Sequence, residues 1–169
     1  MTTGSSAAEA VVNYKRGIQR AVSCVTPTVV DVAGGYHASP IPHRLTMNGG
    51  HPVALGGQPQ LMLRLQQHYR VDETGGAGGH WRVAVLEYYY SIHDAEEKEV
   101  LLYHYHPRGN SPVETPHLHL GPGAQVERIE VRNAHLPTGT VSLNAVLCVL
   151  IEEMGVQPRR SDWDSILTD

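Results

Sequence analysis

Three consecutive segments in the middle of the chain constrain the fold most, because their side-chain patterns suit extended strands. Apolar and polar residues alternate from Leu61 to Val71, as on a strand with one buried face. The segment from Trp81 to Ile92 is dense in aromatic and β-branched residues, and a third segment runs from Glu99 to His106. A Gly-rich stretch at 75–79 and a charged stretch at 94–98 provide the turns. The pattern predicts an antiparallel meander.

Helical patterns flank this meander on both sides. Residues 6–25 combine good helix formers with a moderate apolar stripe, which predicts an N-terminal helix. Near the other end, apolar residues recur at helical spacing over 143–154, with Ser142 as the N-cap and Gly155 as the end of the helix. Residues 161–164 have the form of a capping box and predict a short terminal helix.

The remaining segments give weaker signals. Residues 27–57 are rich in Gly, Pro and His and are predicted to form mainly loops. His117–Leu120 is predicted to be a short extended piece, and Val126–Val131 a strand. We therefore expect one α+β domain over residues 1–169. It would hold an antiparallel sheet of four to five strands, with the N-terminal helix and the C-terminal amphipathic helix packed on it. The sheet and the C-terminal helices would occupy residues 58–169.

Composition and charge limit where this domain is expected to be found and what it is expected to bind. With 41% hydrophobic and 18% charged residues, the chain is expected to bury a single core. No apolar run approaches the roughly 20 residues of a membrane span, and the first residues lack a secretory signal. Both observations predict a cytoplasmic protein without membrane contact. The net charge of −4 gives no general attraction to nucleic acid. Cys24 and Cys148 have no CxxC partner and are expected to be buried thiols.

Two His-x-His segments are the most chemically suggestive feature of the chain. Residues i and i+2 of a strand point to the same face, so His104 and His106 would present their imidazoles together, as would His117 and His119. If the two segments pair across the loop between them, four imidazoles gather. The second pair is the stronger candidate, because Gly and Pro bound its segment, whereas the first pair continues an apolar strand face. Seven further histidines are scattered and carry no strong functional indication: His37, His43, His51, His68, His80, His93 and His135.

The first functional hypothesis is acid–base catalysis without a metal. Cleavage of a phosphodiester by a ribose 2′-OH needs a base, an acid and a cation, and imidazole can fill both proton-transfer roles near neutral pH. A ribonuclease of this kind would use the four paired histidines as catalytic groups and Arg108 to neutralise the phosphate. It would need no cofactor. Further candidates for substrate binding are Arg64, Arg82, Tyr103 and Tyr105.

Metal binding is the second hypothesis. His-x-His on a strand suits Zn²⁺, Mn²⁺ or Fe²⁺, with the four paired histidines as alternative ligands and Glu114 or Glu87 as a carboxylate ligand. His117-Leu118-His119 resembles the start of a cupin motif, although the Glu and the second His that complete that motif are absent. The third hypothesis is a non-catalytic protein-binding or assembly module, in which the histidine face only packs or forms hydrogen bonds.

From about residue 81 to residue 155, an aromatic strand and a charged turn precede a strand carrying Tyr (EVLLYHYHPRG), a Gly-bounded His-x-His (PHLHLGPG) and an amphipathic helix that opens with Ser (SLNAVLCVLIEEMG). In this order of features the chain resembles the TumE-type toxins of prokaryotic toxin–antitoxin pairs. The resemblance implies a bacterial toxin neutralised by an antitoxin of helix-turn-helix type, with His117 and His119 as the positions that carry over. With the ribonuclease hypothesis it predicts an RNA substrate. Residues 1–57 depart from those compact toxins and could form an occluding arm or an element for homo-oligomer assembly.

Overall fold

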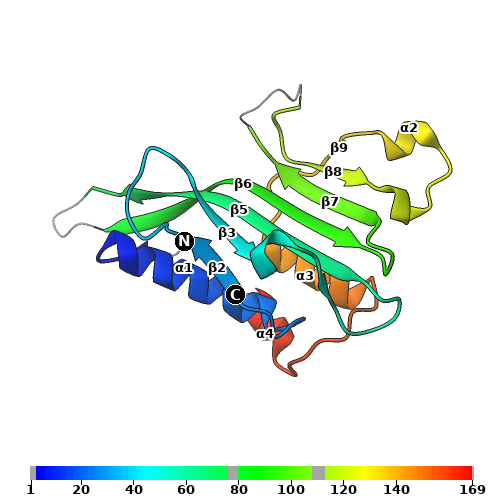
Figure 1. Cartoon of the computed structure of the whole chain (residues 1–169), viewed down its shortest axis with the longest axis horizontal. Helices are drawn as coiled ribbons and strands as arrows, with labels where there is room; N and C mark the ends of the chain where they lie inside the picture. Colours follow the sequence, from blue (N-terminus) through cyan, green and yellow to red (C-terminus); the bar gives the residue numbers. More distant parts are fainter. Residues whose placement is uncertain (1–2, 76–79, 108–112, 169) are drawn as a thin grey trace.

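The computed structural model describes residues 3–75, 80–107 and 113–168 (Figure 1). The elements in chain order are β1 (Thr3–Gly4), α1 (Ala7–Val22), β2 (Val30–Ala33), β3 (His43–Met47), η1 (Asn48–Gly50), β4 (Val53–Ala54), β5 (Met62–Glu73), β6 (Trp81–His93), β7 (Glu99–Tyr105), β8 (His117–Leu120), η2 (Pro122–Ala124), α2 (Ile129–Arg132), β9 (Leu136–Pro137), α3 (Leu143–Glu152) and α4 (Trp163–Thr168). The elements labelled η are single turns of 3₁₀ helix.

Nine strands within these ranges form one antiparallel sheet. Its main path runs β2-β3-β5-β6-β7-β8-β9, while β1 pairs with β6 and β4 pairs with β5. The centre is the long β5–β6 hairpin, in which Leu65 lies opposite Tyr90 and Val71 lies opposite Val83. The structure confirms the α+β class and the predicted meander of three long strands. The sheet is larger than the four to five strands expected from the sequence.

The unexpected strands come mostly from residues 27–57, which were predicted to form mainly loops. β2 and β3 form a hairpin, β3 pairs with β5, and β4 pairs near the start of β5. Val30, Leu45 and Met47 have no exposed surface. These strands span only two to five residues each, and such short pieces between Gly and Pro turns are too short for a period of two to be recognised.

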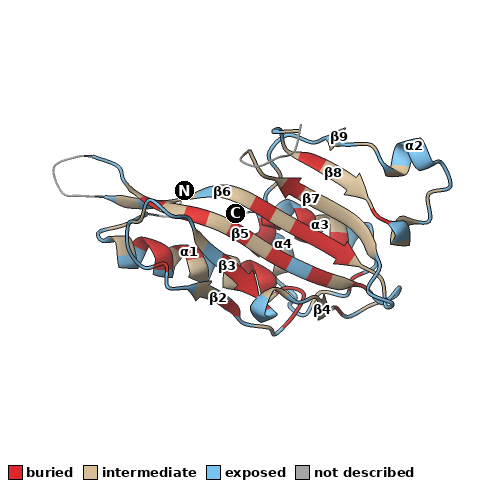
Figure 2. Cartoon of the chain, turned by 45° about the horizontal axis from the view of Figure 1, so that its top comes forward, coloured by how far each residue is buried: buried red, intermediate tan, exposed pale blue. Residues whose placement is uncertain are grey.

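The sheet has one apolar face and one polar face. α1, α3 and α4 lie on the apolar face, below the sheet in Figure 1, and share one buried cluster with it. Along β5 and β6, buried residues alternate with more exposed ones, as the red bands in Figure 2 show. Leu65, Tyr88 and Tyr90 of the sheet and Leu147 of α3 belong to this cluster. The buried residues of β5 and β6 therefore face the helices, and the more exposed residues between them face away from the helices.

Both main helices begin where the sequence predicts. Ser6 caps α1 by accepting a hydrogen bond from Glu9 N at 3.2 Å, and Ser142 caps α3 by accepting one from Ala145 N at 3.1 Å. A short bend follows α3 at Gly155, whose φ of +74° suits glycine. The predicted terminal helix is also present as α4, which buries Ile166 and Leu167.

One predicted strand is wrong. Residues 126–131, expected to be extended, instead lead into the single helical turn α2, which has no buried residue. Ile129 and Val131 are 50% and 40% exposed. The alternation of apolar residues in this segment finds no sheet edge to pair with, because the chain leaves β8 here and returns to it only as β9. Among the helices in the described ranges, none is sufficiently long and apolar for a bilayer crossing.

Candidate metal centre

The pairing of β7 with β8 brings the two His-x-His segments together. His104 lies opposite His117, and Leu102 lies opposite His119, so all four imidazoles project from the same face of the sheet. This is the polar face, opposite α1, α3 and α4. The prediction that four imidazoles gather if the two segments pair is confirmed.

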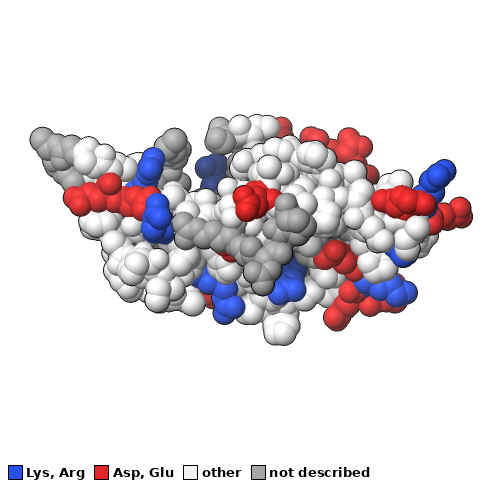
Figure 3. Space-filling model, turned by 90° about the horizontal axis from the view of Figure 1, so that it is seen from above, with Lys and Arg blue, Asp and Glu red and all other residues white. Residues whose placement is uncertain are grey.

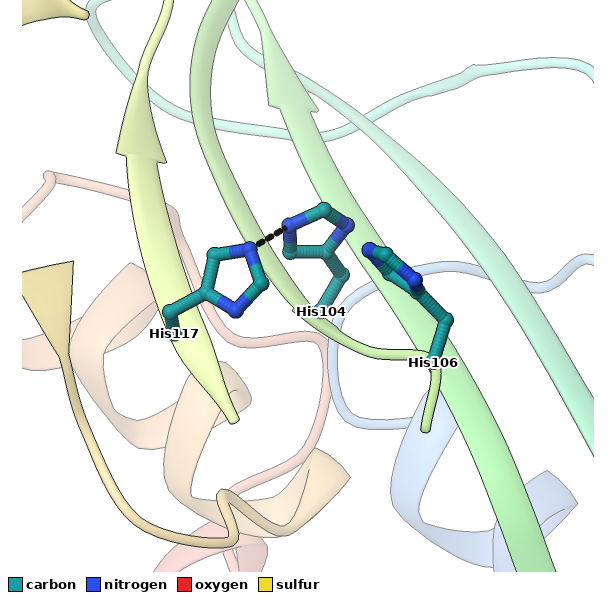
Figure 4. A group of neighbouring side chains, drawn as sticks. All are labelled: His104, His106 and His117. Atoms are coloured by element: carbon teal, nitrogen blue, oxygen red, sulfur yellow. Dashed lines mark hydrogen bonds between the residues drawn. The ribbon is translucent and has the colours of Figure 1, made fainter. Parts of the chain in front are cut away.

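Three of the rings, those of His104, His106 and His117, lie side by side in Figure 4. The ring centroid of His104 lies 4.0 Å from that of His117, 4.7 Å from that of His106 and 4.7 Å from that of His119. The centroids of His117 and His119 are 4.9 Å apart. A hydrogen bond joins the Nε2 atoms of His104 and His117. His104 therefore sits at the centre of the group.

A fifth imidazole joins the group from a segment that carries no His-x-His pattern. His135 precedes β9, and the pairing of Leu136 with Leu118 carries it to the outer side of β8. Its ring centroid lies 4.9 Å from that of His117 and 4.4 Å from that of His119. The sequence pattern carries no strong functional indication for His135, and the structure places it beside the paired histidines. We call His104, His106, His117, His119 and His135 the histidine cluster.

Two overlapping sets within the histidine cluster have the spacing of metal ligands. In His104, His106 and His117, one nitrogen from each ring lies within 4.8 Å of the others, and the same holds for His117, His119 and His135. The first set is the more buried, since His104 is 8% and His117 1% exposed, whereas His135 is exposed. His117 belongs to both sets. An ion in either set would therefore depend on this one residue.

Hydrogen bonding determines which nitrogen of His117 carries the lone pair that could bind a metal ion. Its Nδ1 lies 2.6 Å from the carbonyl oxygen of Thr115. A carbonyl can only accept, so Nδ1 carries the hydrogen and Nε2 of the neutral ring carries the lone pair. In the metal-free protein, His104 Nε2 then donates to His117 Nε2. A backbone carbonyl behind an imidazole is the usual device that orients a ligand histidine toward a metal.

Burial keeps the centre of the cluster neutral. Desolvation first, and the neighbouring imidazoles after it, lower the pKa of His104 to about 3. Burial, followed by the proximity of His135, also lowers the pKa of His119. Protonating His104 would place a positive charge beside the other imidazole rings in a poorly solvated site. The neutral imidazole favoured here is the form that binds metal ions.

Tyr89 and a polar pair on β5 and β6 border the cluster on its inner side. The Tyr89 ring stacks on His106 with centroids 6.1 Å apart and planes 5° apart, and it meets His104 edge-on at 5.9 Å. Beyond it, Glu87 Oε2 lies 2.7 Å from Nδ1 of His68. Glu87, predicted as a carboxylate ligand, is thus engaged by a different histidine.

The other residues predicted for a site lie away from the cluster. Glu114 is exposed and belongs to neither ligand set. Tyr103 and Tyr105 point to the opposite face, where they pack against the core. Arg82 is seven residues from Tyr89 along β6, a separation of about 23 Å on a strand. Arg108 lies outside the described residues.

Arg64 shares the face of the cluster. It lies opposite Ser91, which lies opposite Leu102, which lies opposite His119. Three strand spacings of about 4.8 Å separate Arg64 from the strand of His119. In the view of Figure 3, acidic and basic side chains are scattered, and the coloured residues form no broad patch of Lys and Arg. This distribution does not favour a nucleic-acid surface on that side of the described chain.

Comparison of the chain with family models, with curated proteins and with solved structures finds no match in any of the three.

Proposed function

We propose that the protein binds one divalent transition-metal ion, with Zn²⁺ as the first candidate, through the histidine cluster. The observation that carries this proposal is the arrangement of His117, whose Nδ1 is held by the Thr115 carbonyl while Nε2 faces His104. An all-imidazole donor set suits Zn²⁺, Cu²⁺, Ni²⁺ and Fe²⁺ better than the hard ions Ca²⁺ and Mg²⁺, which take oxygen ligands.

The buried set of His104, His106 and His117 is the proposed primary site. Its rings are shielded by the sheet and by Tyr89, and burial lowers the pKa of His104, which favours the neutral form of that ring. A lone pair on Nε2 can bind only one ion, and His117 is shared by both ligand sets. We therefore expect one tightly bound ion per chain, with His119 and His135 as a weaker alternative set. Three imidazoles around Zn²⁺ leave a fourth position for water or a substrate atom.

The ribonuclease hypothesis gains less support from this geometry. A general acid must be protonated near the working pH, and the pKa of His104 is lowered to about 3. The predicted phosphate contact from Arg108 lies outside the described residues, and Arg82, Tyr103 and Tyr105 are remote from the cluster. The TumE-type toxin interpretation, with its RNA substrate and antitoxin partner, stays a prediction.

Metal analysis of the full-length protein tests the proposal. Protein purified without chelator and dialysed against Zn²⁺ should retain about one ion per chain by elemental analysis, a stoichiometry that the shared ligand imposes. His104→Ala and His117→Ala should lose that ion, whereas His51→Ala, at an exposed histidine outside the cluster, should keep it. Retention of no Zn²⁺, Co²⁺, Ni²⁺ or Cu²⁺ by folded wild-type protein would contradict the proposal.

A further inference from the structure

A second candidate site lies on the opposite, helix-covered side of the sheet. A cavity of about 590 Å³ is bounded by α1, by the apolar face of β5 and β6, and by the ends of α3 and α4. Tyr14, Gln67, Tyr88 and Tyr90 line it together with Leu143 and Asn144 at the start of α3. This volume falls in the range of small-molecule pockets. The cavity shares no residue with the histidine cluster.

The hydrogen bonds of the tyrosines leave donors without an acceptor. Tyr14 donates its hydroxyl to Gln67 Oε1, and Gln67 Nε2 donates to the hydroxyl oxygen of Tyr90 at 2.6 Å. The hydroxyl oxygen of Tyr88 accepts from Val141 N at 3.0 Å. Tyr88 and Tyr90 thus both act as acceptors, and within the described ranges neither hydroxyl hydrogen has a partner.

The number of hydroxyl hydrogens without an acceptor does not depend on how the Gln67 amide is oriented. If its oxygen and nitrogen are exchanged, Tyr90 donates to the amide and the hydroxyl hydrogen of Tyr14 becomes the uncommitted one. Tyr88 and Tyr90 are each 2% exposed, and their rings stack with centroids 4.8 Å apart and planes 10° apart. Burial raises the pKa of both phenols. They therefore remain protonated donors at neutral pH.

The first turn of α3 adds two backbone donors to the same cavity. Ser142 satisfies the N–H of Ala145 through its side chain and that of Val146 through its carbonyl. The N–H groups of Leu143 and Asn144 have no acceptor within the described chain, and both residues line the cavity. The N-terminus of a helix carries a partial positive charge that favours anions.

The other lining residues indicate which chemical class of ligand would fit the cavity. Ile18, Val85 and Leu167 give the cavity apolar sides, and among the described residues its lining includes no Lys, Arg, Asp or Glu. A phosphate dianion would be buried there without a cation, which is costly. A carboxylate carries a single charge and two acceptor oxygens, which match the donors available.

We infer that this cavity binds a small organic carboxylate. Its head would accept hydrogen bonds from the Tyr88 and Tyr90 hydroxyls and from the first turn of α3, and its apolar body would lie against Ile18 and Leu167. Ile18 comes from α1 and Leu167 from α4, so the ligand would contact two helices as well as the sheet. Binding would be independent of any metal in the histidine cluster.

Titration of chelator-treated, full-length protein with benzoate and hexanoate tests this inference. We expect millimolar or tighter binding, seen as amide chemical-shift changes at Tyr88, Leu143 and Asn144, and much weaker binding of benzamide and hexanamide. Tyr88→Phe and Tyr90→Phe should each weaken carboxylate binding about tenfold or more, because each removes a donor to a charged group. The control is Tyr69→Phe, since the buried Tyr69 hydroxyl donates to Gly35 O and does not line the cavity.

A second pair of variants tests the cavity without removing a buried hydrogen bond. Ile18→Phe fills the cavity from a half-buried position on α1 and should also weaken binding, whereas Val12→Phe, exposed on the same helix, should not. No shift with either carboxylate, equal binding of acids and amides, or undiminished binding to folded Tyr90→Phe and Ile18→Phe would each overturn the inference.

Discussion

His104 and His117 face each other directly across the β7–β8 ladder, with their Nε2 atoms joined by a hydrogen bond. Because Nδ1 of His117 is bonded to the Thr115 carbonyl, the hydrogen between the two rings belongs to His104 in the metal-free protein. Loading a metal at both Nε2 atoms therefore requires this hydrogen to leave or to move to Nδ1 of His104. The two rings are thus hydrogen-bonded to each other without metal, and both would be ligands in the proposed metal site.

The five histidines should differ in their importance for metal affinity. Changing His117 to Gln should weaken Zn²⁺ binding by more than about a hundredfold, more than the loss of a residue that only holds a ligand in place, because both ligand sets include His117. His135→Gln should weaken binding much less, since His135 is exposed and outside the primary set. Competition with a chromogenic chelator measures both dissociation constants. Equal losses in the two variants would contradict the assignment of the buried set.

Zinc should stabilise the folded chain. An ion that binds only the native state at a free concentration of one hundred times its dissociation constant adds about 2.7 kcal/mol to the free energy of unfolding. Thermal unfolding followed by circular dichroism should therefore show a higher midpoint with Zn²⁺, reversed by chelator and absent in His117→Ala. If the midpoint of protein that carries Zn²⁺ does not change with Zn²⁺, the ion binds the unfolded chain as well as the folded one, and the prediction is wrong.

Acid should destabilise the metal-free protein through His104. The pKa of this residue is about 3 in the folded chain, against an ordinary value of about 6.5 in the unfolded chain. Above pH 6.5 both states are neutral and the residue contributes nothing. Below it the unfolded state binds the proton first, so stability falls by about 1 kcal/mol per pH unit toward pH 3. Urea denaturation of chelator-treated protein from pH 7 to pH 4 measures this slope, which His104→Leu should reduce.

Two glycine substitutions should change stability in opposite directions. Gly155 has a φ of +74°, and an added Cβ would lie 2.3 Å from the carbonyl oxygen of Gln58, so Gly155→Ala should destabilise by roughly 2 kcal/mol or more. Gly17 lies on the exposed side of α1 with nothing within 4 Å of an added Cβ. Gly17→Ala should stabilise by about 0.5–1 kcal/mol. Chemical denaturation distinguishes the two, and a destabilised Gly17→Ala would contradict the open surroundings of Gly17.

The sequence was informative where a regular period extends over many residues. The alternation from Leu61 to Val71 predicted β5, and the helical stripe after Ser142 predicted α3. The same rule placed each His-x-His on one face, which required only that β7 and β8 be strands.

The failures have a common physical origin in pairing that local pattern does not encode. His135 reaches the cluster only because Leu136 pairs with Leu118 after a turn of helix, and no spacing rule connects residues 119 and 135. Val30 and Leu45 lie in strands of four and five residues, and these strands are placed by pairing: β2 pairs with β3, and β3 pairs with β5. Ile129 shows the reverse case, an apolar residue in a strand-like pattern that finds no strand to pair with.

The two faces of the sheet assign the proposed metal coordination and the packing of the core to different side chains of the same strands. His104 and Tyr89 project to one side, while Tyr103 and Tyr90 project to the other and hold the helices. Exchanging an imidazole for a thiol or a carboxylate would alter the preferred ion while the helix-packed layer keeps its composition. A lineage of such chains could drift from one metal to another by single substitutions and remain folded throughout.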